Sequence, residues 1–250
     1  MKIAINQWAF PGAMPATEAI DIAKRIGFEA FEICIGDEGP VRLDATESDI
    51  IAIRRHAEKA EIALTSVGSG MGWKHALCSP DVDERTRAKD TLDRLLHMAQ
   101  WLGVDCVLTV PGSVTPGVPY DAAIEHALAS VQDVVPTAEK LRVSIAIENV
   151  WNKFLLSPIE MRDFIDQCES EFVGAYFDTG NVILYGFPEQ WIRILGHRIR
   201  MVHAKDYRAG AGDFGFVMLL EGNVNWPAVM AAFRDAVSYT HLTLPTKRIV

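Results

Sequence analysis

Three side chains that can bind a metal ion stand where apolar runs of the sequence end. Glu148 closes the run VSIAIE, Asp178 closes VGAYFD, and His203 closes IRMVH. A charged group at the end of an apolar run is costly to bury unless it has a partner. One such acid alone is usually a helix N-cap or an ion-pair partner. Two carboxylates and an imidazole together suit a divalent cation that keeps open positions for a ligand.

These residues can meet only if the runs form neighbouring parallel strands. The sequence alternates short β-branched runs with longer amphipathic stretches. The predicted strands are Ile3–Trp8, Ala30–Ile35, Ala63–Val67, Val104–Val110, Val143–Glu148, Val173–Phe177 and Ile199–Ala204. The predicted helices are Ala16–Ile26, Glu47–Ala60, Val82–Leu102, Tyr120–Leu141, Pro158–Cys168, Pro188–Leu195 and Trp226–Ala236. Such a series indicates a (β/α)8 barrel or a doubly wound sheet. Because no GxGxxG follows the first strand, we favour the α/β TIM barrel, whose active sites lie at the carboxyl ends of the strands.

The last thirteen residues differ in composition from the rest of the chain. Residues 238–250 contain no Asp or Glu, although the whole chain of 250 residues has 33. Translated cloning sequence has this character. We therefore expect residues 1–237 to form the barrel, with its native eighth strand missing or replaced, and residues 238–250 to be a non-native tail.

Charge and composition restrict the class of partner. The chain has 24 basic and 33 acidic residues, which gives a net charge of -9. Nucleic acids and anionic membrane surfaces need a basic face, so we expect neither as a partner. No apolar run approaches the ~20 residues of a membrane span. The four cysteines are scattered without a CxxC pair, which is typical of reduced thiols in the cytoplasm. We predict a cytoplasmic protein that binds a small molecule, and leave self-association open.

Several polar and aromatic residues follow the predicted strands and are candidates for substrate contact. Cations could neutralise a phosphate or bind hydroxyl groups, an amide could donate to a substrate oxygen, and aromatic rings could line the pocket. Each could instead serve the protein itself, as a surface charge, a turn cap or a packed ring. The candidates are Trp8, His75, Trp151, Asn181, Lys205 and Arg208.

Four short motifs, in this order and spacing, resemble the xylose-isomerase-like TIM barrels. That family includes ketose 3-epimerases, sugar-phosphate isomerases and inosose dehydratases. The resemblance runs from Met1 to about Val237. The motifs are IEN at 147–149, FDTGN at 177–181, HAKD at 203–206 and LEGNVNW at 220–226.

The resemblance implies a metal site and a reaction. Glu148, Asp178 and His203 would bind one divalent ion, which could be Mn²⁺, Mg²⁺, Co²⁺ or Zn²⁺. The reaction implied is isomerisation or epimerisation of a ketose or ketose phosphate. Glu148 would act as a base and remove a proton beside a metal-bound carbonyl, which gives an enediolate. The family's second base is a Glu at the end of strand eight, and no residue here matches it. We therefore expect this chain to turn over slowly.

Three alternatives remain open at this point. A dehydratase of an inosose or dehydroshikimate would use the same metal and the same proton abstraction on the same scaffold. A non-catalytic sugar-binding barrel would need neither base. An apurinic-site endonuclease is disfavoured, because Asn181 stands where that branch has a histidine and because the chain is acidic.

Overall fold

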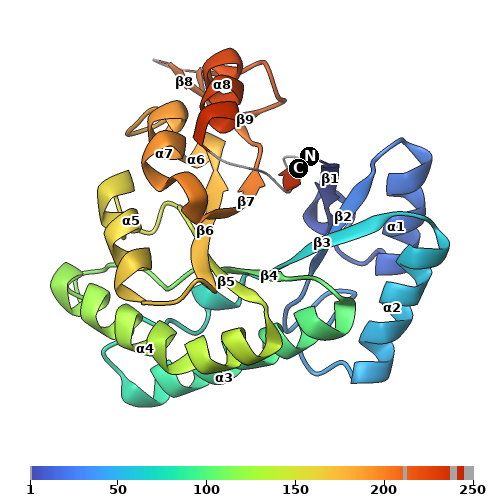
Figure 1. Cartoon of the computed structure of the whole chain (residues 1–250), viewed down its shortest axis with the longest axis horizontal. Coiled ribbons are helices and arrows are strands. Elements are labelled where there is room, and N and C mark those ends of the chain that lie inside the picture. The colour runs from blue at the N-terminus through green and yellow to red at the C-terminus, as the bar shows by residue number, and fades with distance from the viewer. Residues whose placement is uncertain (1, 211–212, 237–240, 245–250) are drawn as a thin grey trace.

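The predicted barrel is confirmed by a computed structural model, which describes residues 2–210, 213–236 and 241–244. Its strands run parallel and follow the closed order β1-β10-β7-β6-β5-β4-β3-β2 (Figure 1). The strands are β1 (Lys2–Asn6), β2 (Ala30–Cys34), β3 (Ala63–Gly68), β4 (Cys106–Thr109), β5 (Ser144–Glu148), β6 (Val173–Asp178), β7 (Ile199–His203) and β10 (His241–Leu244). The carboxyl ends of all these strands therefore lie at one end of the barrel.

The eighth strand position is filled by part of the predicted tail. In β10, Leu242 is in register with Ile3 of β1 and with Val202 of β7, and Thr243 is in register with His203. β10 thus pairs with both β1 and β7, the strands on either side of the eighth position. The remaining residues, 238–240 and 245–250, lie outside the described part of the chain, and the domain boundary at residue 237 stays a prediction.

Helices connect the strands and cover the outside of the barrel (Figure 1). They are α1 (Ala16–Arg25), α2 (Glu47–Lys59), α3 (Val82–Leu102), α4 (Tyr120–Leu141), α5 (Pro158–Gln167), α7 (Pro188–Leu195) and α8 (Trp226–Ala236). Local signals set their ends: Thr46 and Ser157 each begin a capping box, and Gly103 ends α3 with a left-handed φ of 76°. Among the described residues, no helix combines the length and apolar composition needed to cross a bilayer.

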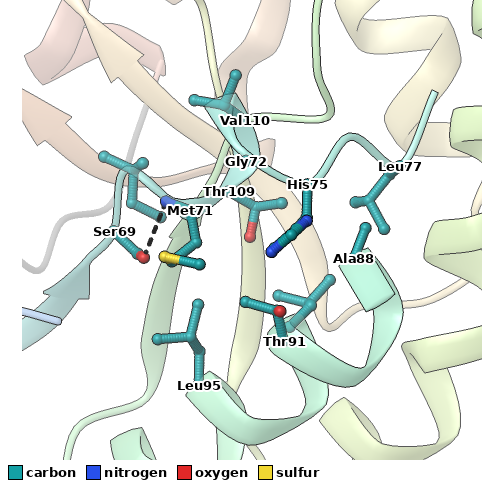
Figure 2. A pocket seen from close by; sticks show the side chains of 12 residues that line it. Ser69, Met71, Gly72, His75, Leu77, Ala88, Thr91, Leu95, Thr109 and Val110 are labelled. Carbon is teal, nitrogen blue, oxygen red and sulfur yellow. Dashed lines mark hydrogen bonds between the residues drawn. The ribbon is translucent and has the colours of Figure 1, made fainter. Parts of the chain in front are cut away.

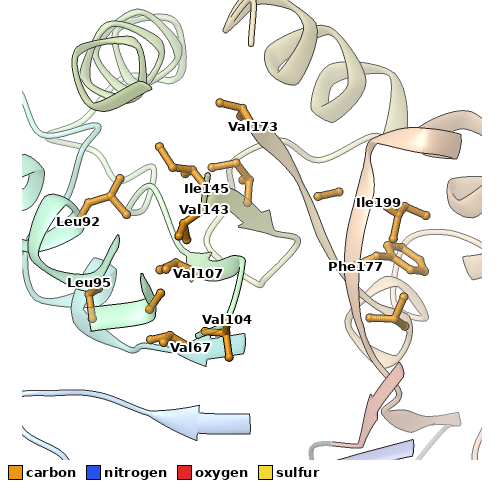
Figure 3. Packing of buried hydrophobic residues seen from close by; sticks show 14 of the residues in the cluster. Val67, Leu92, Leu95, Val104, Val107, Val143, Ile145, Val173, Phe177 and Ile199 are labelled. Carbon is orange, nitrogen blue, oxygen red and sulfur yellow. The ribbon is translucent and has the colours of Figure 1, made fainter. Parts of the chain in front are cut away.

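Two apolar layers explain why the strands show no simple alternation. Val107 and Ile145 are in register and belong to the outer layer, which packs against the helices. Figure 3 shows this layer, with Leu92 of α3 on the helix side. Leu108 and Ala146 are also in register and belong to a second cluster, inside the barrel. Strands buried on both faces read as continuous apolar runs. Polar residues at the inner positions therefore stand out as candidates for the site.

Two segments depart from the predicted pattern. β1 ends at Asn6, two residues early, because the Asn6 side chain accepts a hydrogen bond from the backbone N–H of Trp8 at 2.6 Å and starts a 3-10 helix, Gln7–Ala9. After β7 the chain forms an antiparallel hairpin of β8 (Asp206–Gly210) and β9 (Asp213–Val217). The sequence analysis assigned no strands to this stretch.

Candidate metal centre and substrate cavity

The structure brings together the three residues selected as metal ligands. Glu148, Asp178 and His203 end β5, β6 and β7, and one potential ligand atom from each lies within 4.8 Å of the others. Asp178 and His203 are register partners on adjacent strands. All three side chains are buried. The spacing arises because parallel strands place their carboxyl ends at the same edge.

The donor set fits a divalent cation. The Oδ1 atom of Asp178 accepts a hydrogen bond from the backbone N–H of Asn181 at 2.9 Å. The Oδ2 atom is buried and forms an ion pair with Nζ of Lys205 at 2.6 Å. Burial raises the pKa of Asp178 above its usual value, against the opposing charge of Lys205. Metal–ligand bonds of about 2.0–2.2 Å put ligand atoms up to ~4.4 Å apart, so a small adjustment would let the three residues share one ion.

His203 lies between two glutamates. Its Nδ1 atom is 3.1 Å from Oε1 of Glu148, and its Nε2 atom is 2.9 Å from Oε2 of Glu32. Burial alone would lower the pKa of His203, but the charge of Glu32 and the hydrogen bonds with both glutamates outweigh burial and raise it to about 9. In the metal-free protein the imidazolium therefore balances buried negative charge.

Glu32 is the site residue that the sequence analysis missed. It is fully buried on β2, inside the barrel, and also accepts hydrogen bonds from Asn6 Nδ2 at 2.5 Å, Ser66 Oγ at 3.2 Å and Tyr176 Oη at 2.6 Å. Burial by itself raises the pKa of Glu32, but the charge and hydrogen bond of His203 and the hydrogen bonds from Tyr176 and Asn6 lower it below the usual value. The signal was available: an acid stands in the middle of the apolar strand AFEIC.

Two asparagines join the ends of β5 and β6 through hydrogen bonds. The Asn149 side chain donates to the carbonyl of Asp178 and accepts from its N–H, both at 2.8 Å. Asn181 donates from Nδ2 to the carbonyl of Asn149 at 2.9 Å. Asn181 does line the cavity above the triad, as expected for a substrate contact, but one of its amide hydrogens is already committed to the protein.

A cavity of about 360 Å³ opens beside Glu148, and Asn181 and Lys205 also line it. Trp8 and Trp151, predicted as pocket walls, both border this cavity. A larger cavity of about 1190 Å³ shares Trp8 and Lys205 with it, so the two cavities adjoin. Apolar walls with a few convergent polar groups are typical of small-molecule sites.

Trp151 connects the barrel to the β8–β9 hairpin. Its indole N–H donates to the carbonyl of Asn181 at 2.9 Å. Its ring stacks on Phe216 of β9, with centroids 5.1 Å apart, and meets the edge of Tyr207 of β8 at 5.3 Å. The unexpected hairpin therefore supplies one wall of the substrate cavity.

Two predicted substrate contacts lie elsewhere. His75 lines a small neighbouring cavity of about 20 Å³ against α3, and Figure 2 shows its imidazole near Thr91 and Thr109. Arg208 donates from Nη2 to the carbonyl of Glu221 at 2.8 Å and supports the loop there. Neither residue lines the two cavities at the mouth, so the site proposed below does not include them.

The LEGNVNW motif is explained by one buried carboxylate, that of Asp206. It accepts hydrogen bonds from the backbone N–H groups of Leu220, Gly222 and Val224, at 3.0, 3.1 and 3.1 Å, and from the indole N–H of Trp226 at 3.0 Å. A Cβ atom on Gly222 would lie 2.1 Å from Oδ1 of Asp206, so only glycine fits without a shift. The motif therefore anchors the loop that precedes α8.

Comparisons with known proteins agree with this fold. A sequence model of the family described as xylose isomerase-like TIM barrel matches residues 20–244. A Haemophilus influenzae protein, provisionally named L-ribulose-5-phosphate 3-epimerase, is 22% identical over 208 residues, which cover 82% of this chain and 73% of the relative. The structure of D-psicose 3-epimerase from Clostridium cellulolyticum H10, solved with D-tagatose, has a TM-score of 0.80 and 20% identity over 100% of this chain and 86% of that chain. The IolI protein, solved with a zinc atom, has a TM-score of 0.80 and 15% identity over 98% of this chain and 88% of that chain.

Proposed function

The chain belongs to the xylose isomerase-like TIM barrel family, and from this premise we propose that it is a divalent-metal-dependent isomerase or epimerase of a ketose or ketose phosphate. The observation that carries the proposal is the convergence of Glu148, Asp178 and His203 within 4.8 Å, with Glu148 on the wall of a cavity of about 360 Å³. Similar proteins named as ketose 3-epimerases and a ribulose-phosphate 3-epimerase support the substrate class.

The proposed metal ligands are Glu148, Asp178 and His203. The mixed carboxylate oxygen and imidazole nitrogen donors suit Mn²⁺, Mg²⁺, Co²⁺ or Zn²⁺. The similar IolI structure contains zinc. When bound, the cation would stabilise the negative charge that develops on the substrate oxygens as a proton leaves the adjacent carbon.

The proposed base is Glu148, because it is the triad carboxylate that borders the 360 Å³ cavity. Its carboxylate would remove the proton from the carbon next to the carbonyl and return it from the same face. Lys205, which also borders the cavity, would bind a substrate hydroxyl or phosphate oxygen. The rings of Trp8 and Trp151 would shield the reacting carbon from water.

The chain contains no counterpart of the family's strand-eight glutamate, since β10 has the sequence HLTL. Inversion at carbon needs a second acid on the opposite face, which would supply a proton there. We therefore propose that this chain exchanges a substrate proton with solvent but epimerises slowly. Thr243 is the register partner of His203, so Thr243→Glu is the most direct repair to test.

A deuterium-exchange screen tests the proposal. Ketoses and ketose phosphates are incubated in deuterated water with the Mn²⁺-loaded protein, and deuterium beside the carbonyl is measured by NMR. We expect exchange with wild type, a loss of about 100-fold or more with Glu148→Gln because the base is removed, and faster epimerisation with Thr243→Glu. Equal exchange by wild type and Glu148→Gln, or exchange that needs no metal, would contradict the proposal. Loss of water from the substrate would instead assign a dehydratase, and metal-linked sugar binding without exchange a non-catalytic barrel.

A further inference from the structure

Glu32 occupies a place that the proposed reaction does not use. It is not one of the three clustered ligand residues, and it lies on the far side of His203 from Glu148. Building on the proposed metal site, we propose that Glu32 is a positioning residue: it holds the Nε2–H of His203 and so keeps the Nδ1 lone pair of that imidazole directed at the metal position.

The first step of the argument is the geometry of the imidazole. Its two ring nitrogens have different carboxylate partners, Glu148 at Nδ1 and Glu32 at Nε2, at 3.1 and 2.9 Å. His203 is only 1% exposed, so bulk water does not supply a substitute partner. The ring of Tyr176 packs against the imidazole with centroids 4.4 Å apart. Rotation of the imidazole would break one or both hydrogen bonds and collide with this packing.

The second step concerns the proton on the ring. A carboxylate can only accept, so the hydrogen bond to Glu32 requires a proton on Nε2. When a cation takes the other nitrogen, the neutral tautomer must therefore carry its lone pair on Nδ1. The nitrogen that a metal binds is set by the hydrogen bond of the other nitrogen. The negative charge of Glu32 also makes the imidazole a stronger donor to the cation.

The third step is that Glu32 is itself held. Asn6 of β1, Ser66 of β3 and Tyr176 of β6 donate to it at 2.5, 3.2 and 2.6 Å. Donors from three strands fix the carboxylate inside the barrel, and it cannot swing toward the mouth without breaking these hydrogen bonds. This rigidity is what a residue needs in order to orient another side chain.

The test measures metal binding, so it does not depend on turnover. The dissociation constants of Mn²⁺ and Co²⁺ are determined by calorimetry for wild type, Glu32→Gln and Ser66→Ala, and the visible absorption of bound Co²⁺ reports its ligand geometry. Mutation of a side chain that hydrogen-bonds to a metal-binding histidine typically weakens metal affinity 10–100-fold. We expect a loss of about that size and an altered Co²⁺ spectrum for Glu32→Gln. Ser66→Ala removes only the longest of the three other hydrogen bonds to Glu32, at 3.2 Å, and leaves His203 paired, so we expect a much smaller loss of metal affinity than for Glu32→Gln.

Each result decides the question. Unchanged affinity and an unchanged Co²⁺ spectrum in folded Glu32→Gln would overturn the inference, and so would equal losses in Glu32→Gln and Ser66→Ala. If Glu32→Gln does not fold, Tyr176→Phe replaces it: the ring against His203 stays, the 2.6 Å bond to Glu32 is lost, and a smaller loss of affinity is expected. Failure of wild type to bind either ion would refute the proposed metal enzyme itself, which is a separate outcome.

Discussion

Two buried carboxylates, Glu32 inside the barrel and Asp206 at its mouth, are both satisfied by hydrogen bonds, but from different kinds of donor. Each is at most 1% exposed, and each accepts hydrogen bonds from several donors. The donors of Glu32 are side chains on other strands, and one of them, His203, can change its protonation state or bind a metal. The donors of Asp206 are the backbone N–H of its neighbour Tyr207, backbone N–H groups of the loop 220–224 and one indole. The cluster of Glu32 and its side-chain donors, which we call the Glu32 cluster, can therefore respond to a ligand. The Asp206 cluster, made of Asp206 and its donors, has no such titrating or metal-binding donor and serves the fold.

The largest effect is expected at Asp206. Asp206→Asn places an NH₂ group against N–H donors such as those of Gly222 and Trp226. Buried polar groups left without a partner cost about 1–3 kcal/mol each, so we expect a loss of about 4 kcal/mol in the free energy of unfolding. Urea denaturation measures this loss.

The matched control is Glu221→Gln in the same loop, because the Glu221 side chain is exposed. We expect it to stay within about 0.5 kcal/mol of wild type. The comparison between the clusters also requires that folded Asp206→Asn binds metal normally. A weaker metal affinity in that variant, or a stability loss no greater than that of Glu221→Gln, would break the comparison.

The second effect concerns pH and the Glu32 cluster. The pKa of His203 is raised from 6.5 to about 9 in the folded, metal-free protein. A raised pKa stabilises the fold fully below the unfolded value, and the contribution is lost as pH rises through the folded value. We expect the free energy of unfolding to fall by about 3 kcal/mol between about pH 6.5 and 9.5 in the presence of a chelator.

His203→Gln is the control, since it removes the titrating group and should flatten this part of the pH profile. Saturating metal should also flatten it, because a bound cation replaces the proton. A wild-type profile that falls no more steeply than that of His203→Gln would show that the cluster does not respond to protonation. The contrast with Asp206 would then be lost.

The sequence predicted the triad because each member ends an apolar run, and strand ends in a parallel barrel share one edge. It did not predict Glu32, because a strand buried on both faces hides which residues point inward. Asn6, Glu32 and Ser66 are all inner positions, and only the closed ring of strands shows that they meet one another and that Glu32 faces His203. The β8–β9 hairpin was missed for a similar reason: it is anchored by Asp206 through residues 14 or more positions away, which no local pattern records.

The smallest effect is expected at Trp151, which touches both regions. Its N–H donates to Asn181 beside the triad, and its ring stacks on Phe216 of the hairpin that follows Asp206. Trp151→Phe removes the hydrogen bond and keeps an aromatic ring in the stack, so we expect a loss of about 1 kcal/mol in unfolding free energy. Trp73→Phe, at an exposed cavity residue, is the control and should cost less. If the two regions are independent, Trp151→Phe will leave the Co²⁺ spectrum and metal affinity unchanged while weakening sugar binding. A changed Co²⁺ spectrum or metal affinity would mean that the hairpin and the triad are coupled. The carboxylate of Asp206, which anchors the hairpin, would then not be independent of the metal site.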